Sequence, residues 1–178
     1  MSSSVAEVWD VIAEEAAAES PLWADILLPG DEREPEPVFS PLGEARFALG
    51  IETIYEGYLS HYGRPRLFRA ADRDTALLLG DYLYAHGLVR IAALERPAAV
   101  ADLSELISLC AHLRAENAGG DGAGWAATAA LLGQGVLTEA RAALLEAGDP
   151  ELFLDLVHAA AGEAAVRRSL GLHAARVR

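Results

Sequence analysis

The chain has 178 residues, 52% of them hydrophobic, and a formal net charge of −13. This acidic balance argues against nucleic acid and anionic membrane surfaces as partners, because both attract basic proteins. One cysteine, Cys110, excludes an internal disulfide, and there is neither a basic leader nor a long apolar run. We therefore expect a cytoplasmic protein without a transmembrane segment.

Alanine and leucine dominate the chain and β-branched residues are few, a balance that favours helices over strands. Val8, Trp9 and Ile12 recur at helical spacing, which predicts a first helix ending near Ser20. The acidic, proline-rich segment 29–42 is expected to be a loop that separates this helix from the main bundle, since its prolines disfavour regular structure.

Helical periodicity resumes after this loop and continues to the end of the chain. It predicts helices over about residues 43–62, 73–95, 98–117, 124–133, 138–147 and 150–170. The glycine-rich segment 117–124 is expected to be a flexible loop. No stretch resembles a strand of useful length, so the sequence predicts one all-α domain, a helical bundle over residues 1–178.

Asp81 is the most unusual residue of the long apolar helix predicted after residue 73. At 100° per residue it falls on the arc of Leu77 and Leu88, the expected core side, whereas Tyr82 and His86 lie on a more polar arc. A buried carboxylate has to be paired or hydrogen-bonded. Either a tyrosine, an arginine or a helix terminus satisfies it structurally, or a second acid, a base or a metal makes it functional.

Other side chains give little sign of a chemical site. Glu52 and Glu56 have the spacing to share a divalent cation, although such pairs are more commonly part of a solvated helix face. His61 and His86 are isolated histidines, which usually serve as ordinary polar side chains. There is no cysteine pair, no His-x-x-x-His and no glycine-rich phosphate loop. The residues alone therefore predict no catalytic site, no metal site and no cofactor.

One segment resembles a known family. TALLLGDYLYAHGLVRIAAL, at 75–94, is similar to the helix that follows the first aspartate-rich motif of trans-polyprenyl diphosphate synthases. IETIYEGYLSHYGRPRLFR, at 51–69, resembles the region that carries this motif, and the whole resemblance covers about residues 45–116. It implies a helical bundle like a truncated isoprenoid synthase fold.

The DDxxD motif, whose carboxylates hold Mg²⁺ on an allylic diphosphate in that family, aligns in one of two registers. The registers place its three aspartates at Glu52, Thr53 and Glu56, or at Tyr62, Gly63 and Arg66. Neither register leaves a working magnesium site, and a second DDxxD motif is absent. The resemblance thus favours a protein that is not itself an enzyme.

What the resemblance implies is the short, catalytically silent subunit of heterodimeric long-chain prenyl diphosphate synthases. Such a subunit binds a catalytic partner, or a second copy of itself, and helps to shape an isoprenoid-binding cavity. The candidate ligand- or partner-facing residues are Tyr58, His61, Arg64, Leu79, Asp81, Tyr82, Leu83 and His86.

Three alternatives stay open. The first is an accessory or adaptor subunit of another redox or membrane-associated complex, which holds an apolar isoprenoid or quinone tail. The second is a small Mg²⁺-dependent prenyltransferase, with arginines receiving a diphosphate. In that enzyme Glu52, Glu56 and Asp81 would hold the metal. The diphosphate would bind to Arg64, Arg66 and Arg69. The third is an oligomerising helical module that binds no ligand.

Overall fold

The computed structural model describes residues 3–177, with side chains from residue 8 onward. Within this part of the chain there are nine α-helices and no strand, which confirms the all-α prediction. The helices are α1 (Ser3–Glu19), α2 (Pro21–Ile26), α3 (Ala48–Tyr62), α4 (Arg73–Ala92), α5 (Pro97–Ala115), α6 (Asp121–Ala130), α7 (Thr138–Ala147), α8 (Glu151–Ala161) and α9 (Glu163–Ala174). Short 3-10 turns, η1 (Gly30–Glu32), η2 (Ser40–Leu42) and η3 (Ala45–Phe47), connect α2 to α3.

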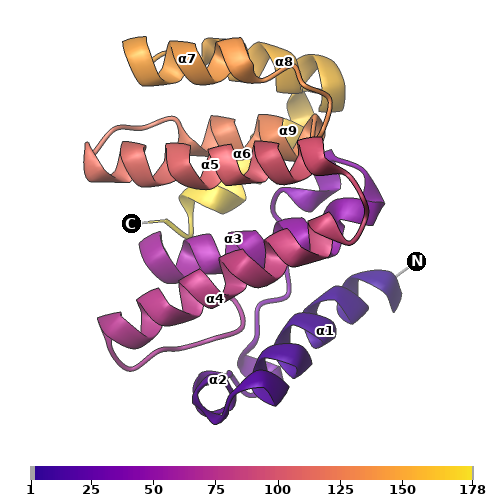
Figure 1. The fold of residues 1–178 in the computed structure, drawn as a ribbon, viewed down its shortest axis with the longest axis vertical. Coiled ribbons are helices and arrows are strands. Elements are labelled where there is room, and N and C mark those ends of the chain that lie inside the picture. The colour runs from indigo at the N-terminus through magenta and orange to yellow at the C-terminus, as the bar shows by residue number, and fades with distance from the viewer. Residues whose placement is uncertain (1–2, 178) are drawn as a thin grey trace.

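The helices form layers along the long axis of the molecule (Figure 1). Helices α1 and α2 lie at one end, and α7 and α8 lie at the other. Between them, α3 and α4 form one layer and α5 and α6 the next (Figure 1). No helix among the described residues combines the length and the apolarity needed to cross a membrane.

The main core is built around α3 and α6. Ile54, Tyr55 and Tyr58 of α3 are fully buried, as are Trp125 of α6 and Phe153 of α8. Helix α6 is buried along nearly its whole length, because its alanines and glycines let the neighbouring helices approach closely. The C-terminal half of the chain thereby encloses the aromatic side of α3.

A second core cluster joins the N-terminal helices to the bundle. Trp9 of α1 and Trp23 of α2 pack with Phe68 against Leu79 and Leu83 of α4. The expected loop 29–42 leads from these helices to the main core, and Val38, Phe39, Ser40 and Leu42 are buried at its end. The acidic segment is therefore anchored at both ends by apolar packing.

Glycines determine how closely α3 and α4 approach each other. Gly57 of α3 lies against Gly80 of α4: a Cβ added to Gly57 would stand 2.9 Å from the Gly80 carbonyl oxygen. Gly50 and Gly87 meet in the same way one heptad away, where a Cβ on Gly87 would stand 3.1 Å from the Gly50 carbonyl oxygen. These four residues form a glycine seam in which two backbones touch without intervening side chains.

Several element boundaries differ from the expectation. The helix predicted from residue 43 begins at Ala48, after the turns η2 and η3. The single helix predicted over 150–170 is two helices, because Gly162 ends α8 with φ of 83°, a left-handed value that favours glycine. Helix α6 begins at Asp121, inside the segment 117–124 that was expected to be a loop. Here burial overrides the low helix propensity of a glycine-rich stretch.

Candidate functional site

Arg66 is the largest charged side chain that is fully buried in the described part of the chain. Its side chain, at 0% exposure, lies in the core between Glu52 and Glu56 of α3, whose side chains are 1% and 0% exposed. Arg66 Nη1 lies 2.6 Å from Glu52 Oε2, and Arg66 Nε lies 2.8 Å from Glu56 Oε2. The two carboxylates raise the pKa of Arg66 against the opposing effect of burial, so the guanidinium stays charged.

Every remaining oxygen of the two carboxylates is also hydrogen-bonded. Glu52 Oε1 accepts from the backbone N–H groups of Val38 and Ser40. Glu56 Oε1 accepts from the backbone N–H groups of Arg66 and Leu67, each at 2.7 Å. The buried ion triad of Arg66, Glu52 and Glu56 therefore fastens α3 to the segments on both of its sides.

The guanidinium also donates to two backbone carbonyls and lies over two aromatic rings. Arg66 Nη1 is 3.0 Å from the Glu36 oxygen and Nη2 is 3.2 Å from the Glu52 oxygen. Its Cζ stands 4.4 Å from the ring centre of Trp9 and 5.0 Å from that of Tyr55. Four oxygens and two ring faces thus surround a single internal cation.

These contacts correct the expectations for Glu52 and Glu56. The pair is neither a solvated helix face nor available for a divalent cation, since Arg66 and four backbone N–H groups occupy its oxygens. The Mg²⁺ that the resemblance implies fits neither register. In one register Arg66 already occupies the carboxylates of Glu52 and Glu56, and in the other Arg66 is itself an aligned position. Among the described residues no group of three or more His, Cys, Asp or Glu side chains could hold a metal ion.

A second polar cluster lies on the other side of α3, where Tyr58 meets α5, α6 and α9. The Tyr58 hydroxyl donates to Asp121 Oδ2 and accepts from Arg114 Nη2 at 2.6 Å. Arg114 Nη2 also lies 2.7 Å from Asp121 Oδ2. His173 Nε2 lies 3.5 Å from the same carboxylate oxygen, and His173 Nδ1 is 2.9 Å from the Tyr55 hydroxyl.

Electrostatics keep Asp121 ionised and Tyr58 neutral in this cluster. Burial tends to raise the pKa of Asp121, but the His173 imidazole, the Tyr58 hydroxyl and the Arg114 guanidinium outweigh burial and hold it well below its usual range. Burial and the Asp121 charge together raise the pKa of Tyr58 far above its usual range. The cluster therefore ties four helices together, with Asp121 charged and Tyr58 neutral at neutral pH.

A groove of about 980 Å³ opens beside this cluster. It lies between the end of α3, the segment 63–72, the start of α4 and the end of α5, where α4 and α5 diverge (Figure 1). Leu28, Phe68 and Leu77 contribute apolar surface to it. Its charged lining residues are Arg64, Arg69, Arg73, Arg114, Glu32, Glu34 and Asp72, which sum to a formal charge of +1.

Asp81 does not face the core, contrary to the expectation. Its side chain is 74% exposed, and its Oδ1 lies 3.2 Å from Nε2 of His61, which is 11% exposed and lines the groove. Burial lowers the pKa of His61 against the charge of Asp81. Leu77 and Leu88, on the arc expected to be buried, are only partly covered. Helix α4 buries its glycine side instead, because the glycine seam brings α3 to that face.

The expected polar arc of α4 is partly covered rather than open to solvent. Tyr82 packs on Trp23 with ring centres 5.6 Å apart, and its ring lies 4.5 Å from that of His86. His86 Nδ1 lies 4.0 Å from Glu15 Oε2 of α1. The N-terminal helices therefore partly cover Tyr82 and His86, which were expected to face a ligand or partner.

The structure divides the candidate residues into three groups. Tyr58, Leu79 and Leu83 are buried inside the chain's own cores. Tyr82 and His86 lie under or beside the N-terminal helices. Only His61, Asp81 and Arg64 come together at the groove or its edge, and Arg64 there pairs with Glu34.

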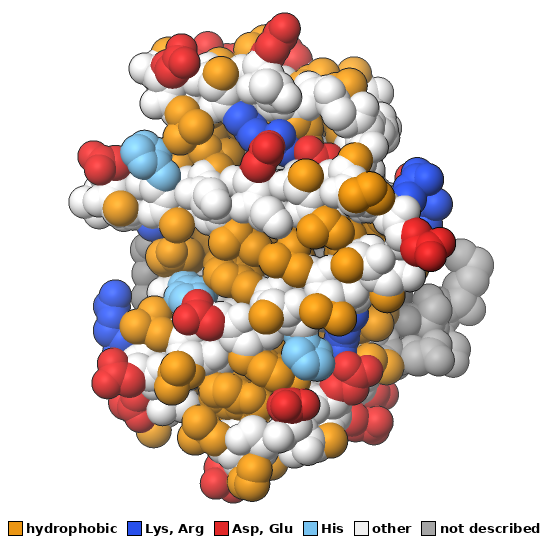
Figure 2. All heavy atoms as spheres, in the orientation of Figure 1, with side chains coloured by type: hydrophobic (Ala, Val, Ile, Leu, Met, Phe, Trp, Pro, Cys, Tyr) orange, Lys and Arg blue, Asp and Glu red, His pale blue; other side chains and the backbone are white. Residues whose placement is uncertain are grey.

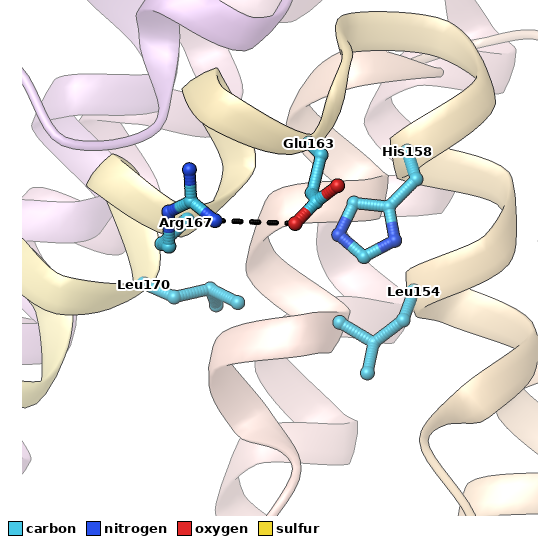
Figure 3. Close-up of a pocket in the computed structure, with 5 residues that line it drawn as sticks. All are labelled: Leu154, His158, Glu163, Arg167 and Leu170. Carbon is cyan, nitrogen blue, oxygen red and sulfur yellow. Dashed lines mark hydrogen bonds and ion pairs between the residues drawn. The ribbon is translucent and has the colours of Figure 1, made fainter.

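A smaller hollow of about 470 Å³ lies between α8 and α9 (Figure 3). Leu154 and His158 come from α8, and Glu163, Arg167 and Leu170 come from α9 (Figure 3). Glu163 and Arg167 form an exposed i,i+4 ion pair of a kind that contributes little to stability. None of the polar side chains that line this hollow is buried.

The sequence reading missed Arg66 as the partner of the glutamates and missed the Asp121 cluster entirely. Asp121 stands in a glycine-rich stretch, and nothing in the local pattern marks it as buried. The glycine seam did leave a signal, because Gly50 and Gly57, and Gly80 and Gly87, are each seven residues apart on neighbouring helices. A paired seven-residue glycine spacing identifies the contact face of two helices.

No protein-family model, no curated protein and no solved structure matches the chain.

Proposed function

We propose that the chain is a non-catalytic helical subunit, similar to the silent small subunits of prenyl diphosphate synthases, that acts by binding a partner protein. One observation carries this proposal: the two carboxylates closest to a metal-binding pattern are buried around Arg66. An internal guanidinium takes the place that a catalytic cation would need, so the residues suit a scaffold better than a metal-dependent enzyme. A cytoplasmic location is part of the same proposal.

The outer face of α4 is the surface that we assign to the partner. Leu78 and Val89 are 57% and 67% exposed, and Asp81 and Ala85 lie exposed between them. Figure 2 shows hydrophobic side chains gathered along the boundary between α4 and α5, on the face of the molecule that Figure 1 views. Because Leu79 and Leu83 are covered by α1 and α2, any contribution to a partner's isoprenoid cavity falls to this outer face.

The test is to purify the chain alone and together with the polyprenyl diphosphate synthase encoded in the same genome. We expect the two to elute as one complex, no Mg²⁺-dependent isopentenyl incorporation by the lone chain, and an altered product length in the complex. Val89→Asp should abolish assembly, whereas the matched variant Val136→Asp, 45% exposed and outside α4, should not. Turnover by the lone chain, or failure to assemble with the synthase, would contradict the proposal.

A second candidate is the accessory subunit that holds an apolar tail, which the apolar lining of the groove favours. Leu28, Phe68 and Leu77 would contact such a tail. Quenching of tryptophan fluorescence by a short-chain quinone tests this candidate, since Trp9 and Trp23 pack in the same cluster as Phe68. Unchanged fluorescence at saturating quinone would exclude it.

A further inference from the structure

The arginines beside the groove are unusual in a chain of this charge. The charged residues that line the groove sum to +1, from four arginines and three acids, while the whole chain carries −13. The remaining residues therefore carry −14. Arg114 is paired with Asp121 behind the groove, so the arginines that can attract an anionic group there are Arg64, Arg69 and Arg73.

The chain itself shows which kind of group these arginines accept. Glu34, in the extended segment after η1, pairs with Arg64 and with Arg176, whose Nη2 lies 3.1 Å from Glu34 Oε2. Glu32, two residues earlier, lies 3.1 Å from Arg69. The groove edge thus already binds carboxylates presented two residues apart on an acidic, proline-containing segment.

One arginine of the groove has no such carboxylate. Arg73 forms no ion pair with any residue that the structure describes, whereas Arg64 and Arg69 each have one. It is the first residue of α4, where the helix dipole favours acids over cations, so its own helix does not stabilise its charge. The adjacent pair of Arg69 and Glu32 is 71% and 47% exposed, and such exposed pairs exchange partners readily.

We propose that the groove binds an extended acidic segment of a partner protein, with carboxylates on Arg73 and, in exchange for Glu32, on Arg69. Arginine clusters recognise acidic motifs in this way, through charge-assisted and often bidentate hydrogen bonds. The groove is open and has apolar as well as charged lining, which suits a peptide better than a small ion. Leu77 lines it and Leu78 begins the exposed face of α4, so the two surfaces are continuous.

This inference rests on the proposed function, because it names the chemistry of the partner. The experiment uses the intact chain and a fluorescein-labelled peptide of alternating glutamate and proline, with an alternating glutamine and proline peptide as reference. We expect fluorescence anisotropy to detect binding of the glutamate peptide only, and the affinity to fall as salt is added.

Arg73→Ala and Arg69→Ala should each weaken binding of the peptide about tenfold, as the loss of one charge-assisted contact predicts. Arg167→Ala is the matched control, since Arg167 is 72% exposed and ion-paired like Arg69 but lies on α9. Absence of binding, or equal binding by all variants, would overturn the inference. Displacement of the peptide by inorganic diphosphate at equal or lower concentration would also overturn it, in favour of a small-anion site.

The outcomes separate this inference from the proposed function. A chain that assembles with the synthase but ignores the acidic peptide retains its proposed function and loses the groove as the binding site. If the chain binds the peptide but does not assemble with the synthase, the groove is confirmed as a binding site for acidic segments and the synthase is excluded as the partner.

Discussion

At the scale of single residues, Arg66 shows how a buried charge can be retained without a metal. Removing a guanidinium and two carboxylates from water is costly, and only good geometry with full hydrogen bonding offsets that cost. Arg66 meets this condition, because both carboxylates and two backbone carbonyls accept from it. The triad is therefore more important for holding one arrangement of α3 than for net stability.

Replacing Arg66 alone should be strongly destabilising. Arg66→Met leaves Glu52 and Glu56 as unpaired buried carboxylates, so we expect the free energy of unfolding to fall by about 3–5 kcal/mol, measured by urea denaturation. Arg69→Met, which removes an exposed arginine, should change it by less than about 0.5 kcal/mol.

The triple variant Arg66→Met with Glu52→Gln and Glu56→Gln should recover part of the loss. Glutamine keeps an acceptor for the backbone N–H groups that both glutamates bind, and it carries no charge. If the single Arg66→Met variant is as stable as the native chain, Arg66 does not form the buried ion pairs with Glu52 and Glu56.

Asp121 gives the chain a pH dependence with a definite sign. Its folded-state pKa is depressed, so its contribution to stability is fully present above the unfolded pKa of about 3.9 and is lost as the pH falls towards the folded pKa. Asp121→Asn should therefore be less stable than the native chain by about 2 kcal/mol at neutral pH. The difference should shrink below about pH 4. A difference that stays constant in urea titrations from neutral to acid pH would contradict this assignment.

At the scale of helices, the glycine seam decides which face of α4 is buried. Gly57→Ala should destabilise the fold by about 1–3 kcal/mol, because its Cβ would meet the Gly80 backbone, which cannot move away as a side chain can. Gly171→Ala is the matched control: it is also helical, but nothing lies within 4 Å of the added Cβ. The control should stabilise the chain by about 0.5–1 kcal/mol, as alanine does in an open helix. Equal thermal shifts for both variants would mean that the helices do not touch there.

Most helices could be predicted from the sequence because apolar spacing and proline positions are local signals. The helix predicted at 138–147 matches α7, and the helix predicted at about 98–117 matches α5 to within two residues at each end. The orientation of α4 could not be predicted in this way. A glycine is nearly neutral on a hydropathy scale, although its lack of a side chain lets a neighbouring helix pack directly against the backbone. Asp81 was assigned to the wrong side for that reason.

The polar clusters were beyond local reasoning because their members are far apart in the chain. Tyr58 and Asp121 are separated by 63 positions, and Tyr55 and His173 by 118. Glu52 and Glu56 are visible as a pair, but their spacing alone cannot tell a metal site from an arginine site. Arg66 decides between the two, and it reaches the glutamates only because the segment after α3 folds back against that helix.

At the scale of the whole molecule, the net charge of −13 opposes compactness through self-repulsion. Added salt screens this repulsion, since the Debye length falls to about 3 Å at 1 M, while the buried triad is screened far less. We therefore expect the melting temperature to rise with sodium chloride. A gain of about 1 kcal/mol corresponds to about 2–4 °C for a chain of this size. A melting temperature that falls with salt would show that exposed ion pairs outweigh the repulsion.

The glycine seam also has a consequence for the order of folding. It joins two helices that are consecutive in the chain, so its closure requires little loop entropy and should come early. Helix α9, held by the long-range contacts of His173, can dock only after the middle of the chain has collapsed. The last event in refolding would then be the arrival of the C-terminal helix, and the first in unfolding its departure.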